Sequence, residues 1–400
     1  MPAEPQPARF TIFGGDIPFW RDERVLRVFA QSVSAVVVLA LLYWAIANVL
    51  AAAQQRGLEL GFDFLSQSAG FPIGESPIPY STTDSFAHAF WVGVLNTLKV
   101  IGVGIVAATV LGTLVGLARL SSNWLMSHLA LVYIEAHRNI PLLVLLLIWY
   151  RGILTTRLPG VVDSIRWPGP IFLNQRGIYL SWPRLTSTGR PFVLAVIIGI
   201  ILAMVAWRVL QQRRVQTGRP TYFGGAAVLT FLICAIAGWF LAAGHPFKVE
   251  VPVLGGFNFS GGLRMTPEFS ALLIGLVMYT AAFIAEVVRA GIQSVDRGQL
   301  EAARAIGLRP SEVLGLVILP QALRVIIPPL ISQFLNLTKN SSLAFFIGYP
   351  ELFSIGRIMI NQAGRAVPVF AMIMLTYLAM SLLTSFVLNL YNRRIQFVER

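Results

Sequence analysis

The chain has 400 residues, of which 56% are hydrophobic and only 12% are charged, and its mean hydropathy is +0.70. Soluble domains carry about 25% charged residues, so this composition excludes an ordinary soluble enzyme and predicts a polytopic membrane protein. The single cysteine, Cys234, excludes a disulfide-stabilised secreted scaffold. The net charge of +13 requires no nucleic acid as partner, because the basic residues fall mainly between apolar stretches, where membrane orientation explains them.

Eight stretches are apolar and long enough to cross a bilayer, whose hydrocarbon core needs roughly 20 helical residues. They are residues 32–53, 89–118, 126–150, 191–209, 223–243, 268–290, 322–346 and 368–390. The seventh is the weakest, because Pro328, Pro329 and several polar residues interrupt it. In the second, Gly112 and Gly116 form a small-xxx-small pair, which predicts close helix packing. The chain is therefore expected to be an all-α polytopic membrane protein with about eight transmembrane helices.

The distribution of arginine and lysine predicts the direction of these spans. With both termini in the cytoplasm, more than half of the 31 Lys and Arg residues fall in cytoplasmic segments. Residues 1–31 resemble no cleavable signal peptide, so they are expected to form a cytoplasmic segment before a retained first span. The external segments 54–88, 151–190 and 244–266 are rich in turn-forming residues, which predicts turns and short irregular caps. The second of these holds six arginines and departs from the charge rule.

The cytoplasmic segment 298–321 differs in kind from the other connections. Residues 299–306 favour a short helix, Gly307 allows a turn, and Pro310 can open a second helix. The apolar residues of that second helix repeat at i, i+3 and i+4: Leu314, Val317 and Ile318. Two short amphipathic helices at the membrane surface predict a docking site for another protein. A plain re-entrant connector between spans fits the periodicity equally well.

The spacing in this segment resembles the cytoplasmic coupling loop of bacterial ABC importer permeases. That loop has the pattern E-A-A, three residues, G, nine residues, I, one residue, L-P. The chain supplies these places with Glu301, Ala302, Ala303, Gly307, Val317, Leu319 and Pro320. Val317 stands where the family usually has isoleucine. The resemblance implies docking into a groove on an ATPase subunit, where small Ala302 and Ala303 would allow close approach and Glu301 and Arg304 would pair at the rim.

Segments on either side of the loop narrow the resemblance. Residues 133–144, 279–297 and 337–353 look like the polar amino acid uptake permeases of the histidine/glutamine type. At position 139 the chain has asparagine where that family commonly has glycine. The first span and the inserted spans four and five resemble the longer, Q-type permease subunit of the general L-amino acid importer.

This resemblance implies a type I ABC importer permease core with an extra N-terminal helix and a two-helix insertion. The expected organisation is a cytoplasmic segment 1–31, a first helix with its loop 32–88, a core in 89–152 and 268–395, and an insertion 153–267. The resemblance also implies the partners: two ATP-binding subunits, a second permease subunit forming a heterodimer, and a periplasmic amino-acid-binding protein. The substrate would be an L-amino acid, and the membrane would be the bacterial inner membrane.

The chain lacks the residues needed to hydrolyse ATP by itself. A P-loop needs G-x4-G-K-[ST], and none of the three lysines follows such glycines. Four scattered histidines offer no metal-ligand spacing, and no catalytic constellation is present, so neither a cofactor nor a metal is predicted. An ion-coupled secondary amino-acid transporter is the alternative, since it would need neither an ATPase nor a docking loop.

Charged residues within the spans suggest a path for the substrate. Glutamate followed three residues later by arginine occurs twice, as Glu135/Arg138 and Glu286/Arg289, and residues at this spacing are neighbours on a helix. Each pair could form an internal salt bridge, or could face the ammonium and carboxylate of a zwitterion. Proline after such a pair frees backbone carbonyls, which is tolerated at membrane depth where a cavity is lined. The predicted path residues are Glu135, Arg138, Asn139, Pro141, Glu286 and Lys339.

Overall fold

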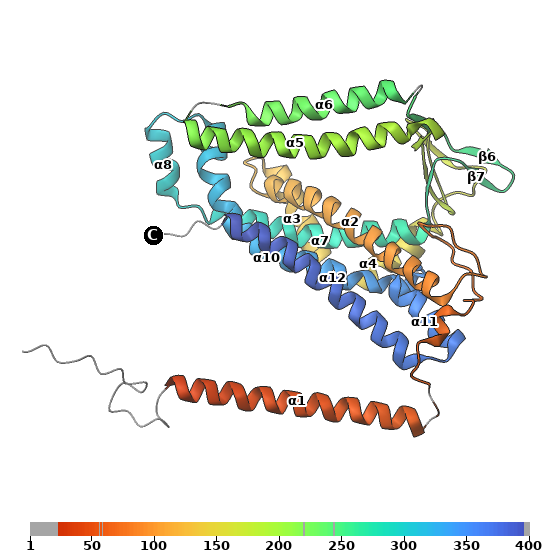
Figure 1. Ribbon diagram of the computed structural model, residues 1–400. Helices are drawn as coiled ribbons and strands as arrows, with labels where there is room; N and C mark the ends of the chain where they lie inside the picture. The colour runs from red at the N-terminus through yellow and green to blue at the C-terminus, as the bar shows by residue number, and fades with distance from the viewer. Residues whose placement is uncertain (1–22, 56, 58, 219–220, 243–244, 396–400) are drawn as a thin grey trace, which may run out of the picture.

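The structure is a computed structural model that describes residues 23–55, 57, 59–218, 221–242 and 245–395. Most of the predicted cytoplasmic segment 1–31 therefore lies outside the described residues. Long helices run between two ends of the molecule (Figure 1). One end carries the short helix α8 (Arg297–Ala305), and the opposite end carries the strands; they are called the α8 end and the sheet end.

The helices account for most of the described chain. In order they are α1 (Glu23–Gln55), the 3-10 helix η2 (Asp63–Ser66), α2 (Phe86–Arg119), α3 (Trp124–Asn139), α4 (Leu142–Leu147), the π-helical η3 (Ile148–Leu154), the 3-10 helix η4 (Ser187–Gly189), α5 (Arg190–Thr217), α6 (Phe223–Leu241), α7 (Pro267–Gln293), α8, α9 (Pro310–Glu312), the π-helical η5 (Val313–Ile318), α10 (Leu319–Asn340), the 3-10 helix η6 (Ser341–Ile347), α11 (Leu352–Ala363) and α12 (Ala366–Ile395).

Seven of the described helices are long and apolar enough to cross a membrane, and a bent pair supplies an eighth. The bent pair is α3 with α4–η3, which corresponds to the predicted third span and turns by 105° at its break. The eight predicted spans are thus confirmed, with helix ends moved outward by several residues in most cases. The beginning of α1 and the end of α12 both lie at the α8 end, as an even number of spans requires (Figure 1).

Helices α2 and α7 pack closely along most of their length and form the centre of the bundle. A Cβ at Gly112 would lie 2.6 Å from Cβ of Ile284, and a Cβ at Gly116 would lie 2.7 Å from the carbonyl oxygen of Ala285. Only glycine allows this approach, so the predicted small-xxx-small packing is confirmed. Ile284 itself is fully buried in the apolar cluster that α10 and α12 complete.

The sheet end contains β structure that corrects the expected irregular caps. A four-stranded antiparallel sheet has the order β1 (Ile165–Trp167), β2 (Ile171–Asn174), β3 (Gly177–Leu180) and β8 (Leu263–Met265). A ribbon joins β4 (Trp182–Leu185) to β5 (Phe247–Glu250), and a hairpin joins β6 (Val253–Gly255) to β7 (Asn258–Ser260). The two external segments pair with each other, for instance Tyr179 opposite Arg264. Strands of only three or four residues, paired with partners far away in the sequence, leave no local hydropathy signal.

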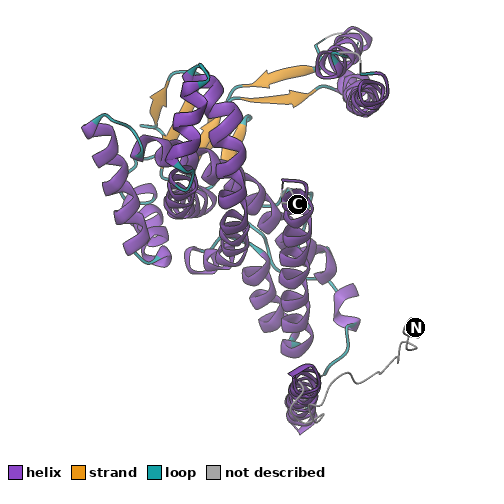
Figure 2. Ribbon diagram, turned by 90° about the vertical axis from the view of Figure 1, so that its left-hand side faces the viewer, coloured by secondary structure: helices purple, strands orange, loops and turns teal. Residues whose placement is uncertain are grey.

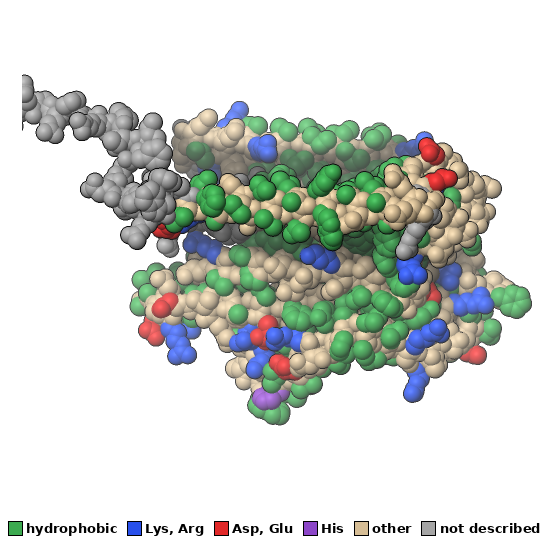
Figure 3. Space-filling model, turned by 90° about the horizontal axis from the view of Figure 1, so that it is seen from below, with side chains coloured by type: hydrophobic (Ala, Val, Ile, Leu, Met, Phe, Trp, Pro, Cys, Tyr) green, Lys and Arg blue, Asp and Glu red, His purple; other side chains and the backbone are tan. Residues whose placement is uncertain are grey.

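Two parts of the molecule stand outside the bundle. Helices α5 and α6 form a hairpin that packs on itself and stands apart from the other helices (Figure 2). Helix α1 also stands apart, and hydrophobic side chains cover it along its length (Figure 3). Its connection to the bundle is held by an ion pair between Glu59 and Arg365. Helix α1 exposes apolar side chains along its length and the hairpin exposes them on its outer faces, which is expected of helices surrounded by lipid.

Candidate functional site

The segment 298–321 forms the helix, turn and second helix start that its sequence predicts. Asp296 caps α8 by accepting a hydrogen bond from the backbone N–H of Gly298 at 2.6 Å. Gly307 ends it with a φ of +82°, a left-handed conformation that glycine adopts without strain. Pro310 opens α9, and the carboxylate of Glu312 accepts from the N–H of Arg309 at 2.8 Å. The resulting knob projects from the α8 end of the bundle (Figure 1).

The two alanines of the motif point in different directions. Ala302 is exposed, whereas Ala303 is only 4% exposed on the helix that contacts η5. Within the single chain Ala302 is therefore the more accessible of the two, and close approach of a partner at both alanines stays a prediction. No ion pair joins Glu301 to Arg304 among the described residues, and both side chains are exposed.

The second half of the motif lies on a helix that continues into the membrane. Val317 belongs to the π-helical η5, and Leu319 and Pro320 begin α10 without a break. Val317 is half-buried, whereas Leu319 is 40% exposed. Exposed residues thus occur in both halves of the loop, on α8 and its turn and also at Leu314 and Leu316 of η5. Ile306, which the sequence analysis did not select, is 77% exposed at the turn. An isoleucine beside a glycine turn in this loop is the signal that would have identified it.

The predicted break in the third span is present at Ile140 and Pro141. Ile140 has extended backbone, and Pro141 is the N-cap residue of α4, which begins at Leu142 after the 105° bend. Proline cannot donate to the preceding turn, so the helix ends there and restarts in a new direction. The bend leaves Glu135, Arg138 and Asn139 exposed at the end of α3.

The two glutamate–arginine pairs behave differently. Arg289 holds Glu286 through three N–H···O contacts, the shortest 2.8 Å from Nη2 to Oε2, as the internal salt-bridge hypothesis predicts. Glu135 instead accepts a hydrogen bond from Nδ2 of Asn139 at 3.1 Å, and no ion pair to Arg138 occurs within the described ranges. The reason is that Arg138 turns toward α7, where its guanidinium lies 5.5 Å from the centre of the Phe283 ring.

The structure brings most of the predicted path residues together but leaves one apart. Arg138 on α3 lies against Phe283 of α7, three residues before Glu286, so α3 and α7 share one charged region. Lys339 lies on α10 instead, and within the described residues no hydrogen bond or ion pair joins its ammonium to that region. Lys339 extends an exposed polar face of α10 that also contains Ser332 and Asn336, because residues three or four apart share one face of a helix. A polar face on an apolar spanning helix indicates contact with water or a protein partner rather than lipid.

A buried polar network at the sheet end was missed by the sequence analysis. The carboxylate of Glu75 receives a 2.6 Å contact from the ammonium of Lys99 and a 2.6 Å hydrogen bond from the hydroxyl of Thr266. Asn96 donates to the carbonyl oxygens of both Glu75 and Pro350, at 2.9 and 2.8 Å. The network therefore ties the external segment 61–85 to α2, to the start of α7 and to the connection before α11. A lysine within an apolar span was its only sequence signal.

Glu351 forms a second buried group beside this network. It caps α11 by accepting from the N–H groups of Phe353 and Ser354 at 2.8 and 2.7 Å, and it also accepts from the Tyr377 hydroxyl at 2.7 Å. Burial raises the pKa of the Glu351 carboxyl above its ordinary value, against the hydrogen bonds, which lower it. Within the described ranges, no group of three or more metal-ligating side chains is close enough to hold an ion.

Known proteins that resemble this chain are components of transport systems. Residues 101–397 match the protein family described as "Binding-protein-dependent transport system inner membrane component". The chain is 41% identical over 382 residues to the general L-amino acid transport system permease protein AapQ of Rhizobium johnstonii, covering 95% of this chain and 94% of that protein. It is 44% identical over 373 residues to the putative amino-acid ABC transporter permease protein YhdX of Escherichia coli, covering 92% and 94%. The crystal structure of an amino acid ABC transporter with histidines gives a TM-score of 0.46 at 23% identity, over 77% of this chain and 95% of that one.

Proposed function

Because the chain belongs to the family of binding-protein-dependent inner-membrane transport components, and so is a membrane-spanning permease subunit of an ABC importer, we propose that it passes L-amino acids of broad type across the bacterial inner membrane. The names of two relatives that align with more than nine-tenths of the chain support amino acids as solutes. The family favours an ABC importer over an ion-coupled secondary carrier.

The proposal assigns the other tasks to other chains. Two ATP-binding subunits hydrolyse ATP, a periplasmic binding protein delivers the amino acid, and a second, different permease subunit completes the path. The sheet end, with its arginine-bearing segment 151–190, faces the periplasm and receives the binding protein. The α8 end and both termini face the cytoplasm, which agrees with the positive-inside distribution of arginine.

The exposed face of α8 is the observation that carries the coupling step. A helix of nine residues is marginal in isolation, yet α8 is capped at Asp296 and closed at Gly307. Its outward face presents Glu301, Ala302 and the exposed Ile306. A groove on an ATPase subunit can therefore bury Ile306 and Ala302, with the charge of Glu301 at the edge of the contact. Movement of the ATPases would then be passed through η5 into α10, because the helix is continuous there.

The charged region of α3 supports the path for the amino acid. Glu135, Arg138 and Asn139 are exposed in a single chain, and at membrane depth such groups must face a cavity or a second permease. Arg138 is placed to attract the carboxylate of a zwitterion, and Glu135 its ammonium group. The break at Pro141 frees backbone carbonyls that line the same region, and Glu286 supplies a fixed neighbouring charge. Lys339 lines the path from α10.

The coupling proposal is tested by charge reversal at Glu301 in the purified complex. Glu301→Lys should abolish ATP-driven uptake into proteoliposomes while leaving the chain folded and extractable. Gln212→Lys, an exposed position at the same end on α5, is the matched control and should keep uptake near wild type. Uptake that survives Glu301→Lys, or uptake without any ATPase subunit, would overturn the proposal in favour of an ion-coupled carrier.

The path proposal is tested by kinetics rather than assembly. Arg138→Gln and Glu135→Gln should each lower the maximal rate of uptake at least tenfold without changing the composition of the complex. Trp124→Phe, at the exposed beginning of the same helix, serves as the control. Unchanged uptake kinetics in Glu135→Gln, Arg138→Gln and a third variant, Lys339→Gln, would remove these residues from the path.

A further inference from the structure

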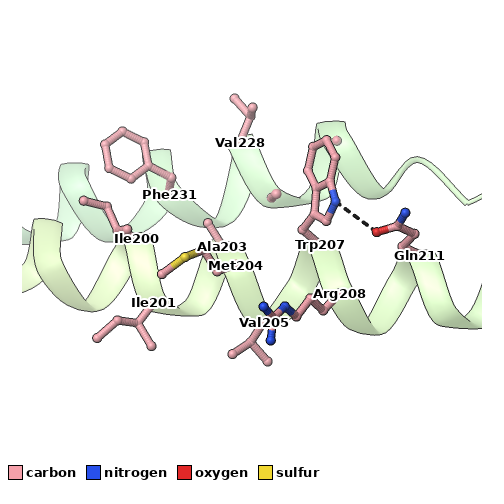
Figure 4. A pocket seen from close by; sticks show the side chains of 12 residues that line it. Ile200, Ile201, Ala203, Met204, Val205, Trp207, Arg208, Gln211, Val228 and Phe231 are labelled. Atoms are coloured by element: carbon pink, nitrogen blue, oxygen red, sulfur yellow. Dashed lines mark hydrogen bonds between the residues drawn. The ribbon is translucent and has the colours of Figure 1, made fainter. Parts of the chain in front are cut away.

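The hairpin of α5 and α6 is packed tightly in one half and open in the other. Near the sheet end, a Cβ at Gly238 would lie 2.4 Å from Cβ of Ala195, and one at Gly199 would lie 2.8 Å from Cβ of Cys234. Toward the α8 end the helices leave a groove of about 870 Å³ (Figure 4). Small residues close the first half, whereas Trp207 and Phe231 stand on the two helices that border the groove.

The groove is apolar along its length and polar at one end. Ile200, Met204 and Phe231 line the apolar part, and Arg208 and Gln211 lie toward the α8 end (Figure 4). The indole N–H of Trp207 donates to Oε1 of Gln211 at 3.2 Å. The guanidinium of Arg208 is exposed and has no hydrogen bond or ion pair with any residue that the structure describes. A cation at the end of an apolar groove is thus left for an external anion.

Helix lengths place this arginine at the membrane boundary. The 19 residues of α6 span about 28 Å, close to the ~30 Å hydrocarbon thickness of a bilayer. The hydroxyl of Thr221 donates to the carbonyl of Leu210 at 2.9 Å, which puts the start of α6 level with that part of α5. Helix α5 continues to Thr217, so its last residues extend past the hydrocarbon. Arg208 therefore lies where acyl chains end, and Arg213 and Arg214 lie at the level of the headgroups.

We propose that this groove binds one phospholipid with an anionic headgroup from the surrounding leaflet. An acyl chain lies along Ile200, Met204 and Phe231, and the headgroup phosphate pairs with Arg208 beside Gln211. The positive field of Arg213 and Arg214 selects an anionic lipid over a zwitterionic one, because juxtamembrane arginines attract anionic leaflets. An apolar transmembrane helix from another subunit would cover the apolar lining but would supply no counter-charge for Arg208. The proposal does not depend on which solute the permease carries.

Native mass spectrometry of the intact complex tests the proposal, with dioleoylphosphatidylglycerol and dioleoylphosphatidylcholine as the two probes. Wild type should bind one phosphatidylglycerol at least tenfold more tightly than phosphatidylcholine at this site. Arg208→Gln should lose that preference, and Arg208→Lys, which keeps the charge, should retain it. Arg190→Gln, at the opposite end of α5, is the matched control and should leave the preference intact.

A photo-crosslinker placed at Met204 identifies the occupant directly. Recovery of a lipid adduct supports the proposal, whereas a crosslink to a helix of another subunit overturns it. Equal binding of the two lipids by wild type, or an unchanged preference in Arg208→Gln, would also overturn it.

Discussion

Replacing Glu75 by glutamine should loosen the external segment 61–85 from the sheet end. Glu75 is the centre of the buried network: its carboxylate lies 2.6 Å from the ammonium of Lys99 and accepts from the hydroxyl of Thr266 at 2.6 Å. Glutamine has nearly the same volume and keeps an acceptor for Thr266. The substitution therefore removes the negative charge opposite Lys99 and little else.

The magnitude follows from how far the ion pair is shielded from water. The Glu75 side chain is 13% exposed and that of Lys99 is 33% exposed. Exposed pairs contribute about 0.2–1 kcal/mol, and breaking a fully buried pair costs about 3–5 kcal/mol. A partly shielded pair should fall between these limits, at about 1–2 kcal/mol for opening of the segment. This corresponds to a roughly 5- to 30-fold larger population of the open form.

Hydrogen exchange measured by mass spectrometry on the assembled complex reads this population directly. The backbone N–H groups of Ala69, Gly70 and Phe86 are hydrogen-bonded within or next to the segment, so their exchange reports its opening. Glu75→Gln should accelerate this exchange 5- to 30-fold under conditions where closing is fast. Asp63→Asn, an exposed carboxylate in the same segment, should change it less than twofold.

A double-mutant cycle separates the ion pair from other effects of the substitution. In a Lys99→Met background, Glu75→Gln should no longer accelerate exchange, because the ammonium it paired with is gone. The reasoning fails if Glu75→Gln leaves exchange within twofold of wild type, or if it acts equally in the two backgrounds.

Three further predictions concern packing, pH and docking. Gly112→Leu should destabilise the bundle by about 1–3 kcal/mol or more, because a Cβ there meets Ile284 at 2.6 Å. Gly102→Leu on the same helix is the control, because a Cβ there meets nothing within 4 Å. Equal melting temperatures for the two variants would contradict this prediction. The raised pKa of Glu351 means that the folded chain binds this proton more tightly than the unfolded chain, so its contribution to stability is complete below about pH 4.5 and is lost as the pH rises through the folded value. Glu351→Gln should therefore make the melting temperature depend less on pH above that value. An unchanged pH dependence of the melting temperature would reject the raised pKa of Glu351. Ile306→Asp should weaken binding of the ATPase subunits by about 1.5–3 kcal/mol, which is the free energy of burying an isoleucine side chain. Co-purification at graded concentrations measures this loss. An unchanged affinity would show that Ile306 stays exposed in the complex.

Local signals in the sequence were sufficient for the spans and for the exposed loop. A helix that crosses hydrocarbon must be apolar for about 20 residues, so hydropathy alone located all eight spans. The helix at 299–306, the turn at Gly307 and the opening at Pro310 also follow from local propensity and backbone freedom. The break before Pro141 was predictable because proline cannot continue a hydrogen-bonded helix.

Contacts between distant segments decided the rest, because they depend on which surfaces meet and not on local composition. The two external segments form a sheet only by pairing with each other, and neither contains a strand pattern long enough to detect. The direction of Arg138 was set by the Phe283 ring on another helix, which left Glu135 to pair with Asn139. The burial of Ala303 was decided by how α8 packs beside η5. The network around Glu75 joins residues that lie far apart in the chain, and only the packed structure brings their charges together.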